Sequence, residues 1–298
     1  MTDKKGLNNW IKGVGYETAF WNNVFRWKHT YNGLMQWSNY GDVISLEGFD
    51  ANEFLLKHDT PRVLDVGCGM SYATGDFINR DGEKEKLDIH YVDFLAVEFN
   101  KILKRHKRQL PEIEFGMMEY LSVFFDKVNP HLIVIQNALD HSSQPVKSII
   151  EAIRVLPLGG TLYLNHHPNE AETEKYKGFH QFNVNEKDGN LIIWNKEDET
   201  NVNQLVDGFA DIEVKRHENG HIIAIITKVA DVPQSIVDDK KDMCEMCNAF
   251  LAESLKSSSI SRSIALKSKY CFFNITQFFA QALPWSLKMK VKKLIGQA

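Results

Sequence analysis

Two short motifs, a glycine turn and an acidic residue, carry the chemistry that the sequence shows most clearly. Residues 62–66 are typical of a buried strand, and Gly67-Cys68-Gly69 makes the turn after it. We expect a helix over 72–80 to follow, so that free N–H groups and the dipole at its N-terminus favour a polar or anionic ligand group. Glycines in such a turn let a ligand approach the backbone closely, although they are equally typical of tight strand–helix packing.

The acidic residue is Asp93, at the end of a second predicted strand, 88–92. At the tip of the second strand of a βαβ unit, a carboxylate is placed to accept hydrogen bonds from two ribose hydroxyls. Taken alone, Asp93 is as typical of an N-cap for a helix that begins at Ala96. Together with the glycine turn, it favours a nucleoside-binding site over a purely structural role.

The chain resembles the class I S-adenosylmethionine-dependent methyltransferases in four motifs, which stand in the family's order over residues 60–165. The motifs are Val63-Leu64-Asp65-Val66-Gly67-Cys68-Gly69, Tyr91-Val92-Asp93, residues 132–141 and residues 153–164. The Asp-x-Gly-x-Gly form of the turn also differs from the longer Gly-x-Gly-x-x-Gly turn of nicotinamide dinucleotide sites. The resemblance therefore implies S-adenosylmethionine as the cofactor.

The resemblance also implies which residues contact this cofactor: Asp65, Gly67, Cys68, Gly69, Asp93, Phe94, Met118, Glu119 and Asn137. Three positions depart from the family pattern. The third glycine of the turn is Ser71, and the acid often found near the adenine is replaced by Met117, which leaves Glu119 nearby. The Pro-Gly-Gly before the fifth strand is Leu158-Gly159-Gly160. These departures concern contacts to the adenine and the methionine carboxylate rather than the fold.

Strand and helix patterns alternate through the middle of the chain, which favours a parallel sheet with helices on both faces. We expect strands over 62–66, 88–92, 112–115, 131–136 and 160–166, and helices over 72–80, 95–107 and 145–156. Asn219-Gly220 between 210–216 and 221–228 is a strong hairpin signal. The resemblance implies that this hairpin closes the sheet. The expected fold class is α/β, a Rossmann-like, doubly wound, mostly parallel sheet with an antiparallel final hairpin.

Three regions make up the expected organisation. A helical, aromatic-rich N-terminal cap covers 1–58, a cofactor-binding domain covers 59–230, and a basic helical extension covers 231–298. Within the domain, 167–208 is longer than an ordinary connection and contains a small hairpin around Asp188-Gly189, which is typical of a substrate-side insertion. In the cap, most aromatic side chains are expected to pack on the sheet, and Tyr16 and Glu17 are the two candidates for ligand contact.

Four histidines are candidates for a general base, because an acceptor hydroxyl must lose its proton and imidazole titrates near neutral pH. They lie after predicted strands or in the insertion: His141, His166, His167 and His180. Asn137, Asp140 and Glu170 are candidates to orient a histidine or to bind substrate hydroxyls. We predict no metal, because no clear acidic pair accompanies the histidines, although a site formed by Asp140 and the histidines stays an alternative. Cys244-x-x-Cys247 has no matching second pair and is expected to pack within a helix.

Composition limits the class of protein. The chain has 43% apolar residues, no apolar run of 18 residues, no signal-peptide pattern and four cysteines without a disulfide framework, so we expect a reducing cytoplasm. From Ser254 onward there are eight basic and no acidic residues, whereas residues 1–253 carry 27 basic against 39 acidic residues, a net charge of −12. The acidic body, and the lack of an Asn-Pro-Pro-Tyr motif after the fourth strand, disfavour a nucleic-acid substrate.

The leading hypothesis is O-methylation of a small hydroxylated acceptor, with a sugar or a lipid-linked glycan intermediate of bacterial surface-polysaccharide synthesis as the favoured class. The motive is the basic, aromatic C-terminal extension, which suits an acidic glycan or peripheral contact with an anionic inner membrane face. A free small molecule, such as a quinone precursor or a natural product, is the alternative acceptor, and a non-catalytic cofactor-binding module is the alternative to an enzyme. A homodimer is a further expectation.

The extension generates the first prediction. Phe272, Phe273 and Trp285 supply apolar and interfacial side chains, and Lys288, Lys290, Lys292 and Lys293 each contribute about 1 kcal/mol near an anionic leaflet. We therefore expect salt-sensitive flotation with anionic vesicles but not with neutral ones, lost on removal of the residues after 255 while cofactor binding survives. Absence of flotation with both vesicle types would favour the alternative, in which the extension docks on the acidic body of its own chain or of a dimer partner.

Overall fold

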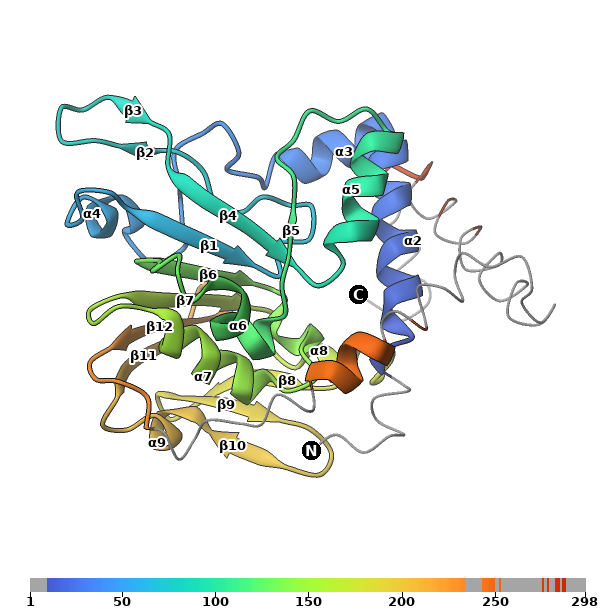
Figure 1. Ribbon diagram of the computed structural model, residues 1–298. Helices are drawn as coiled ribbons and strands as arrows, with labels where there is room; N and C mark the ends of the chain where they lie inside the picture. Colours follow the sequence, from blue (N-terminus) through green and yellow to red (C-terminus); the bar gives the residue numbers. More distant parts are fainter. Residues whose placement is uncertain are drawn as a thin grey trace.

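The computed structural model describes residues 10–233, 243–249, 252, 275, 278, 282–284 and 286–287. Its centre is a seven-stranded sheet in the order β11-β12-β7-β6-β1-β4-β5 (Figure 1). The strands are β1 Arg62–Val66, β4 Asp88–Asp93, β5 Glu114–Phe115, β6 Leu132–Gln136, β7 Thr161–His166, β11 Ala210–Arg216 and β12 Ile222–Lys228. Strands β5, β4, β1, β6 and β7 pair in parallel, and β12 is antiparallel to both β7 and β11. The predicted mostly parallel sheet with an antiparallel final hairpin is confirmed.

The two central strands carry buried apolar side chains on both faces, as expected for parallel strands covered on each side. Along β1, Leu64 and Val66 belong to one buried cluster and Val63 to another. Along β6, Ile133 and Ile135 belong to the first cluster, whereas Leu132 and Val134 belong to the second. Because successive side chains of a strand point to opposite faces, this alternation divides the core into two layers, one on each side of the sheet.

Short helices cover the two layers. The first layer is closed by α6, Leu121–Phe125, and α7, Pro145–Val155, which opens with proline at its first turn and buries Ile149, Ala152 and Ile153. The second layer is closed by α4, Ala51–Leu55, and the segment before it. A third group of helices stands beside the C-terminal edge of the sheet (Figure 1): α2 Gly13–Arg26, α3 Lys28–Met35 and α5 Ala96–Arg105.

The insertion forms a three-stranded sheet of its own, in the order β10-β9-β8. Its strands are β8 Asn183–Lys187, β9 Asn190–Trp194 and β10 Glu199–Asn201, with the short helices α8 Glu170–Thr173 and α9 Val202–Leu205 beside them. The predicted turn is present, and both central residues have positive φ, 53° at Asp188 and 75° at Gly189. Val184, Leu191 and Ile193 join the first core layer, so the insertion packs against the main sheet.

The predicted helix over 72–80 is wrong. Residues 72–75 form no regular secondary structure, and β2, Phe77–Ile78, pairs with β3, Lys84–Glu85. The N-terminal cap holds this segment, because Asp76 N donates to Asp42 O at 2.8 Å and Ile44 N donates to Asp76 O at 2.7 Å. Thr74 and Gly75 are poor helix formers, so these tertiary hydrogen bonds prevail over a weak local preference.

This correction changes the role of the glycine turn. No helix N-terminus follows it, and its own N–H groups bond within the protein. Gly67 N and Cys68 N donate to Val92 O at 2.8 and 3.2 Å, and Gly69 N donates to the Asp93 carboxylate at 3.0 Å. The anion site that the sequence predicted at a helix N-terminus is therefore absent from the described part of this turn.

Most of the basic extension lies outside the described residues, including Phe272, Phe273, Phe279, Trp285, Lys288, Lys290, Lys292 and Lys293. Of the described part, Phe278 packs on Trp27 with ring centroids 4.9 Å apart, beneath the guanidinium of Arg26. Cys247 Sγ lies 3.6 Å from Met117 Sδ, in keeping with the predicted packing role of that cysteine. Within the described ranges, we find no helix with both the length and the apolar character that a bilayer crossing requires.

Gly75 provides a test of the corrected segment. A Cβ at this position would lie 2.2 Å from Asn39 O and 2.3 Å from Asp42 O. We expect Gly75→Ala to lower the free energy of unfolding by about 1–3 kcal/mol, the usual cost of overpacking. Gly33→Ala in α3 is the matched control, because a Cβ there meets nothing within 4 Å and alanine favours a helix by up to about 1 kcal/mol. Chemical denaturation measures both, and equal stabilities for the two variants would contradict the assignment.

Candidate functional site

A cavity of about 1430 Å³ opens at the C-terminal edge of the main sheet. Its floor includes the ends of four parallel strands, at Val66, Asp93, Gln136 and Asn165. Its roof comes from α2 and α3, through Glu17, Phe20, Trp21, Val24, His29, Thr30, Gly33 and Leu34. Ligands of open α/β sheets bind at this edge, and the volume exceeds the roughly 300–1,000 Å³ of a single-ligand pocket. The cavity therefore has room for two molecules.

The glycine turn lies beneath the roof. Gly67 and Gly69 have φ values of 66° and 55°, which other residues adopt at a cost. A Cβ on Gly67 would lie 2.6 Å from the Cβ of Ala138, and one on Gly69 would lie 2.8 Å from Trp21 Cζ2. The glycines therefore bring the turn into contact with Trp21 and Ala138, while their backbone still lines the cavity.

Asp93 is held by backbone N–H groups at the tip of β4, and the N-cap of α5 is Leu95 rather than Asp93. Its Oδ1 accepts a hydrogen bond from Leu95 N at 2.7 Å, and its Oδ2 accepts one from Gly69 N at 3.0 Å. Burial raises the pKa of this carboxyl to about 6, against the lowering effect of those two backbone bonds. Each carboxylate oxygen can accept a second hydrogen bond, and Asp93 lines the cavity.

Asp65 differs from the other predicted cofactor residues, because it does not line the cavity. Its side chain is buried, and Oδ2 accepts hydrogen bonds from Thr74 Oγ1 at 2.9 Å and Thr74 N at 3.3 Å. Burial raises its pKa to about 6. This carboxylate fixes the segment after the glycine turn.

Burial also raises the pKa of the Cys68 thiol, which stays protonated and unreactive at neutral pH.

The remaining predicted cofactor residues all line the cavity: Phe94, Met118, Glu119 and Asn137. Glu119 is buried, and its Oε1 accepts hydrogen bonds from Ser142 Oγ and Ser143 N, both at 2.8 Å. It therefore fixes the approach to α7. Asn137 has a left-handed φ of 49°, and its Oδ1 accepts a hydrogen bond from His167 N at 3.1 Å, which ties the ends of β6 and β7 together.

A buried carboxylate organises the histidines. Asp140, fully buried on η2 (Leu139–His141), has Oδ1 2.9 Å from His166 Nε2 and Oδ2 2.5 Å from His180 Nδ1. Burial opposes its charge, but His141 and His166 outweigh this and hold the pKa of Asp140 below its ordinary range. For His180, burial would lower the pKa, but the bond to Asp140 raises it to about 9.

His166 is unsuited to act as the base. Its side chain is only 2% exposed, and both ring nitrogens face acceptors, Asp140 Oδ1 at 2.9 Å and His167 O at 2.7 Å. Burial alone would lower its pKa, but the Asp140 charge and hydrogen bond raise it above the ordinary value. The ring is therefore a structural partner of Asp140.

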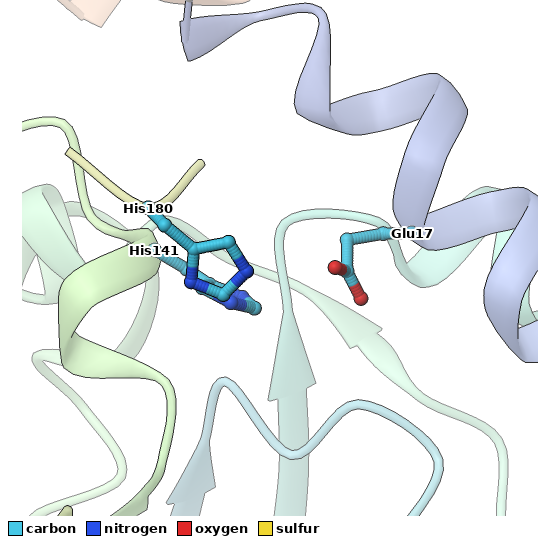
Figure 2. Close-up of side chains that lie close together, drawn as sticks. All are labelled: Glu17, His141 and His180. Carbon is cyan, nitrogen blue, oxygen red and sulfur yellow. The ribbon is translucent and has the colours of Figure 1, made fainter. Parts of the chain in front are cut away.

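Glu17 of α2 faces the other two histidines of this region. Figure 2 shows its carboxylate directed toward His180 and His141, and one donor atom from each of the three lies within 4.8 Å of the others. Asp140, Glu170 and His180 form a second group with the same spacing. The prediction of no metal rested on the lack of acidic partners, and the fold supplies Glu17 and Glu170 from other elements.

A separate pair of histidines lines the cavity at the end of β7. The rings of His167 and His221 meet edge to face, with centroids 4.2 Å apart. His221 Nδ1 lies 2.9 Å from Asn165 Oδ1. Burial first, and then the charge of His221, lower the pKa of His167. Burial likewise lowers the pKa of His221. Both rings are therefore neutral at neutral pH.

The site gathers residues that the sequence both did and did not single out. Of the predicted catalytic and substrate residues, His141 and His167 line the cavity, whereas Tyr16, Asp140, His166, Glu170 and His180 do not. Sequence reasoning missed Trp21, Trp37, Asn165 and His221. A signal existed for His221, because it begins the predicted last strand, whose antiparallel partner ends at His166. For Trp21 the sequence offered only an aromatic-rich helical pattern, which does not indicate which side chain lines a cavity.

Comparison with known proteins gives no match to a protein-family model and no match among curated proteins. Solved structures resemble the fold at low identity. The PH0226 protein from Pyrococcus horikoshii is 15% identical, with 68% of this chain and 99% of that chain covered, at a TM-score of 0.35. A SAM dependent methyltransferase from Aquifex aeolicus is 13% identical, with 60% and 86% covered, at 0.36. A putative S-adenosylmethionine dependent methyltransferase from Listeria monocytogenes is 14% identical, with 57% and 91% covered, at 0.36. At these scores, the functional argument depends on the site itself.

Proposed function

We propose that this protein is an S-adenosylmethionine-dependent methyltransferase that methylates a hydroxyl of a small acceptor. One observation carries the proposal: a single cavity joins the Asp93 carboxylate at the tip of β4 to the neutral His167 at the end of β7. The first is suited to a ribose and the second to a hydroxyl proton. Their common cavity, with room for two molecules, supports transfer of a group between a nucleoside cofactor and an acceptor.

The residues along the cavity fit the cofactor. Asp93 would accept hydrogen bonds from the ribose hydroxyls, and Phe94 and Met118 offer apolar surface for the adenine. The backbone of Gly67–Gly69 would border the methionine part, because these residues line the cavity beside Asp93. When bound, the cofactor supplies a methyl group activated on a sulfonium.

The protein's own contribution is alignment and proton removal. Methyl transfer is an in-line displacement, for which an enzyme positions the two reactants and excludes water. Trp10, Trp21 and Phe179 are aromatic walls suited to water exclusion. Of the predicted bases, His167 fits best, since it lines the cavity and its lowered pKa leaves the imidazole neutral and able to accept a proton.

For the acceptor, we favour a sugar or a lipid-linked glycan intermediate. Amide side chains line the cavity near His167, at Gln136, Asn137 and Asn165, and amides are suited to hydrogen bonds with several hydroxyls. The basic extension would attract an acidic glycan or an anionic membrane surface. Both features support a polyhydroxylated acceptor over an apolar one.

Asp93 tests the cofactor half of the proposal. Asp93→Ala should weaken binding of S-adenosylhomocysteine at least about tenfold, because each lost charge-assisted hydrogen bond is worth about 1.5–3 kcal/mol. Asp88→Ala, an exposed acid at the opposite end of the same strand, is the matched control and should bind like the parent. Isothermal calorimetry measures all three proteins. Equal affinities for the two variants would refute the placement of the ribose, and no binding by the parent at millimolar ligand would refute the function.

His167 and His221 test the acceptor half. His167→Asn should keep cofactor affinity and lose roughly 10²–10⁴ in turnover on a hydroxylated sugar found by screening with labelled cofactor.

In the parent, activity should fall as pH drops through the lowered pKa of His167, which is faced by His221, His166 and Asp140. His221→Asn removes a ring that, once protonated at acidic pH, lowers the pKa of His167, so the acidic limb of the activity profile should move to higher pH. Histidine ring resonances followed by NMR give the pKa independently, and an unmoved pKa of His167 would contradict the coupling.

A further inference from the structure

We propose that Glu17, His141 and His180 form a binding site for a divalent transition-metal ion at the edge of the cavity (Figure 2). The three side chains come from α2, from η2 and from the segment before β8, which are far apart in the sequence. Glu17 and His141 both line the cavity. The site itself does not depend on the proposed methyl transfer.

The spacing suits a shared ion. The three donor atoms lie within 4.8 Å of one another. Nitrogen and oxygen ligands stand about 2.0–2.2 Å from Zn²⁺, so two ligands of one tetrahedral ion are about 3.4 Å apart. A pair at the 4.8 Å limit must therefore approach by about 1.4 Å. Rotation of the Glu17 side chain can supply this movement, because the side chain is half-buried and has rotatable bonds.

A second observation comes from the partner of His180. Its Nδ1 bonds the buried Asp140 carboxylate at 2.5 Å, and Asp140 is held in turn by His166. Metal-binding histidines commonly bond a carboxylate through the nitrogen that does not bind the metal, which fixes the ring and makes the other nitrogen a stronger ligand. Figure 2 shows one ring nitrogen of His180 directed toward Glu17. The Asp140–His180 pair thus directs the second ring nitrogen to the cluster, where a metal ion would take the place of its proton.

The ligand types identify the class of ion. Two imidazoles and one carboxylate suit Zn²⁺, Mn²⁺, Fe²⁺ or Co²⁺, whereas Mg²⁺ and Ca²⁺ prefer oxygen ligands. Three protein ligands leave coordination positions open, and the cavity adjoins them through Glu17 and His141. An ion there would be accessible to a small oxygen ligand such as a hydroxyl or carboxylate. If the proposed function holds, this ligand would be the acceptor.

Metal titration of the full chain, stripped with a chelator and free of cofactor, tests the proposal. Calorimetry with Zn²⁺, and visible absorption with Co²⁺, should show one ion per chain, and Mg²⁺ should not compete. Glu17→Gln and His180→Asn should each weaken binding at least about tenfold and alter the Co²⁺ spectrum. His29→Asn is the matched control, because His29 lines the same cavity outside the cluster. Circular dichroism checks the fold of each variant.

Each result decides. Absence of metal binding by the parent would overturn the proposal and mark the cluster as an ion pair. Unchanged metal affinity and Co²⁺ spectrum in folded Glu17→Gln would also overturn it and mark the binding as adventitious. Glu170→Gln separates the two groups that share His180. Loss of binding in Glu170→Gln with none in Glu17→Gln would place the ion in the other group and refute this ligand set. Because no cofactor is present, failure here leaves the methyltransferase proposal untouched.

Discussion

The buried carboxylate of Asp140 is the constraint on which the arrangement of the site depends. A carboxylate with no exposed surface is strongly destabilising unless it is paired and hydrogen-bonded. Asp140 meets this requirement with His166 from the end of β7 and His180 from the insertion. One charge therefore fastens the loop after β6, the last residue of β7 and the segment before β8 to each other. Removal of that carboxylate would take the charge and hydrogen-bond partner from both imidazoles, so the positions of the three segments depend on one buried group.

The N-terminal cap completes the site from the opposite side. Trp21 lies over Gly69, and the Trp10 indole donates a hydrogen bond to His141 O at 2.8 Å. The same region binds the segment after the glycine turn through Asp42. Residues 72–80 were predicted to form a helix, and in the structure hydrogen bonds to the cap hold this segment instead. The cap also covers the strand ends, which would otherwise form an open edge, so that they line a cavity.

The strands of the sheet could be predicted because apolar residues buried on both faces leave a strong local pattern, as in β1 and β6. Asp93 and the Asn219-Gly220 hairpin were equally predictable, since a strand tip and a tight turn require particular residue types. The conformation of 72–80 was not, because backbone bonds to Asp42 lie far away in sequence and override helix propensity. The approach of Glu17 to His180 depends on the packing of α2, for which an amphipathic pattern gives a face but not a neighbour.

Two adjacent histidines show how this fold separates structure from chemistry. His166 and His167 are consecutive, so in extended backbone their side chains point to opposite sides. His166 turns inward to Asp140, where the carboxylate raises its pKa despite burial. His167 turns to the cavity, where burial and His221 lower its pKa, and it stays neutral. When the environment moves the pKa values of two neighbouring titratable groups in opposite directions, the two groups can take different roles in acid–base chemistry. The alternation of side chains at the end of β7 thereby places a histidine that builds the site next to an imidazole that can accept a proton.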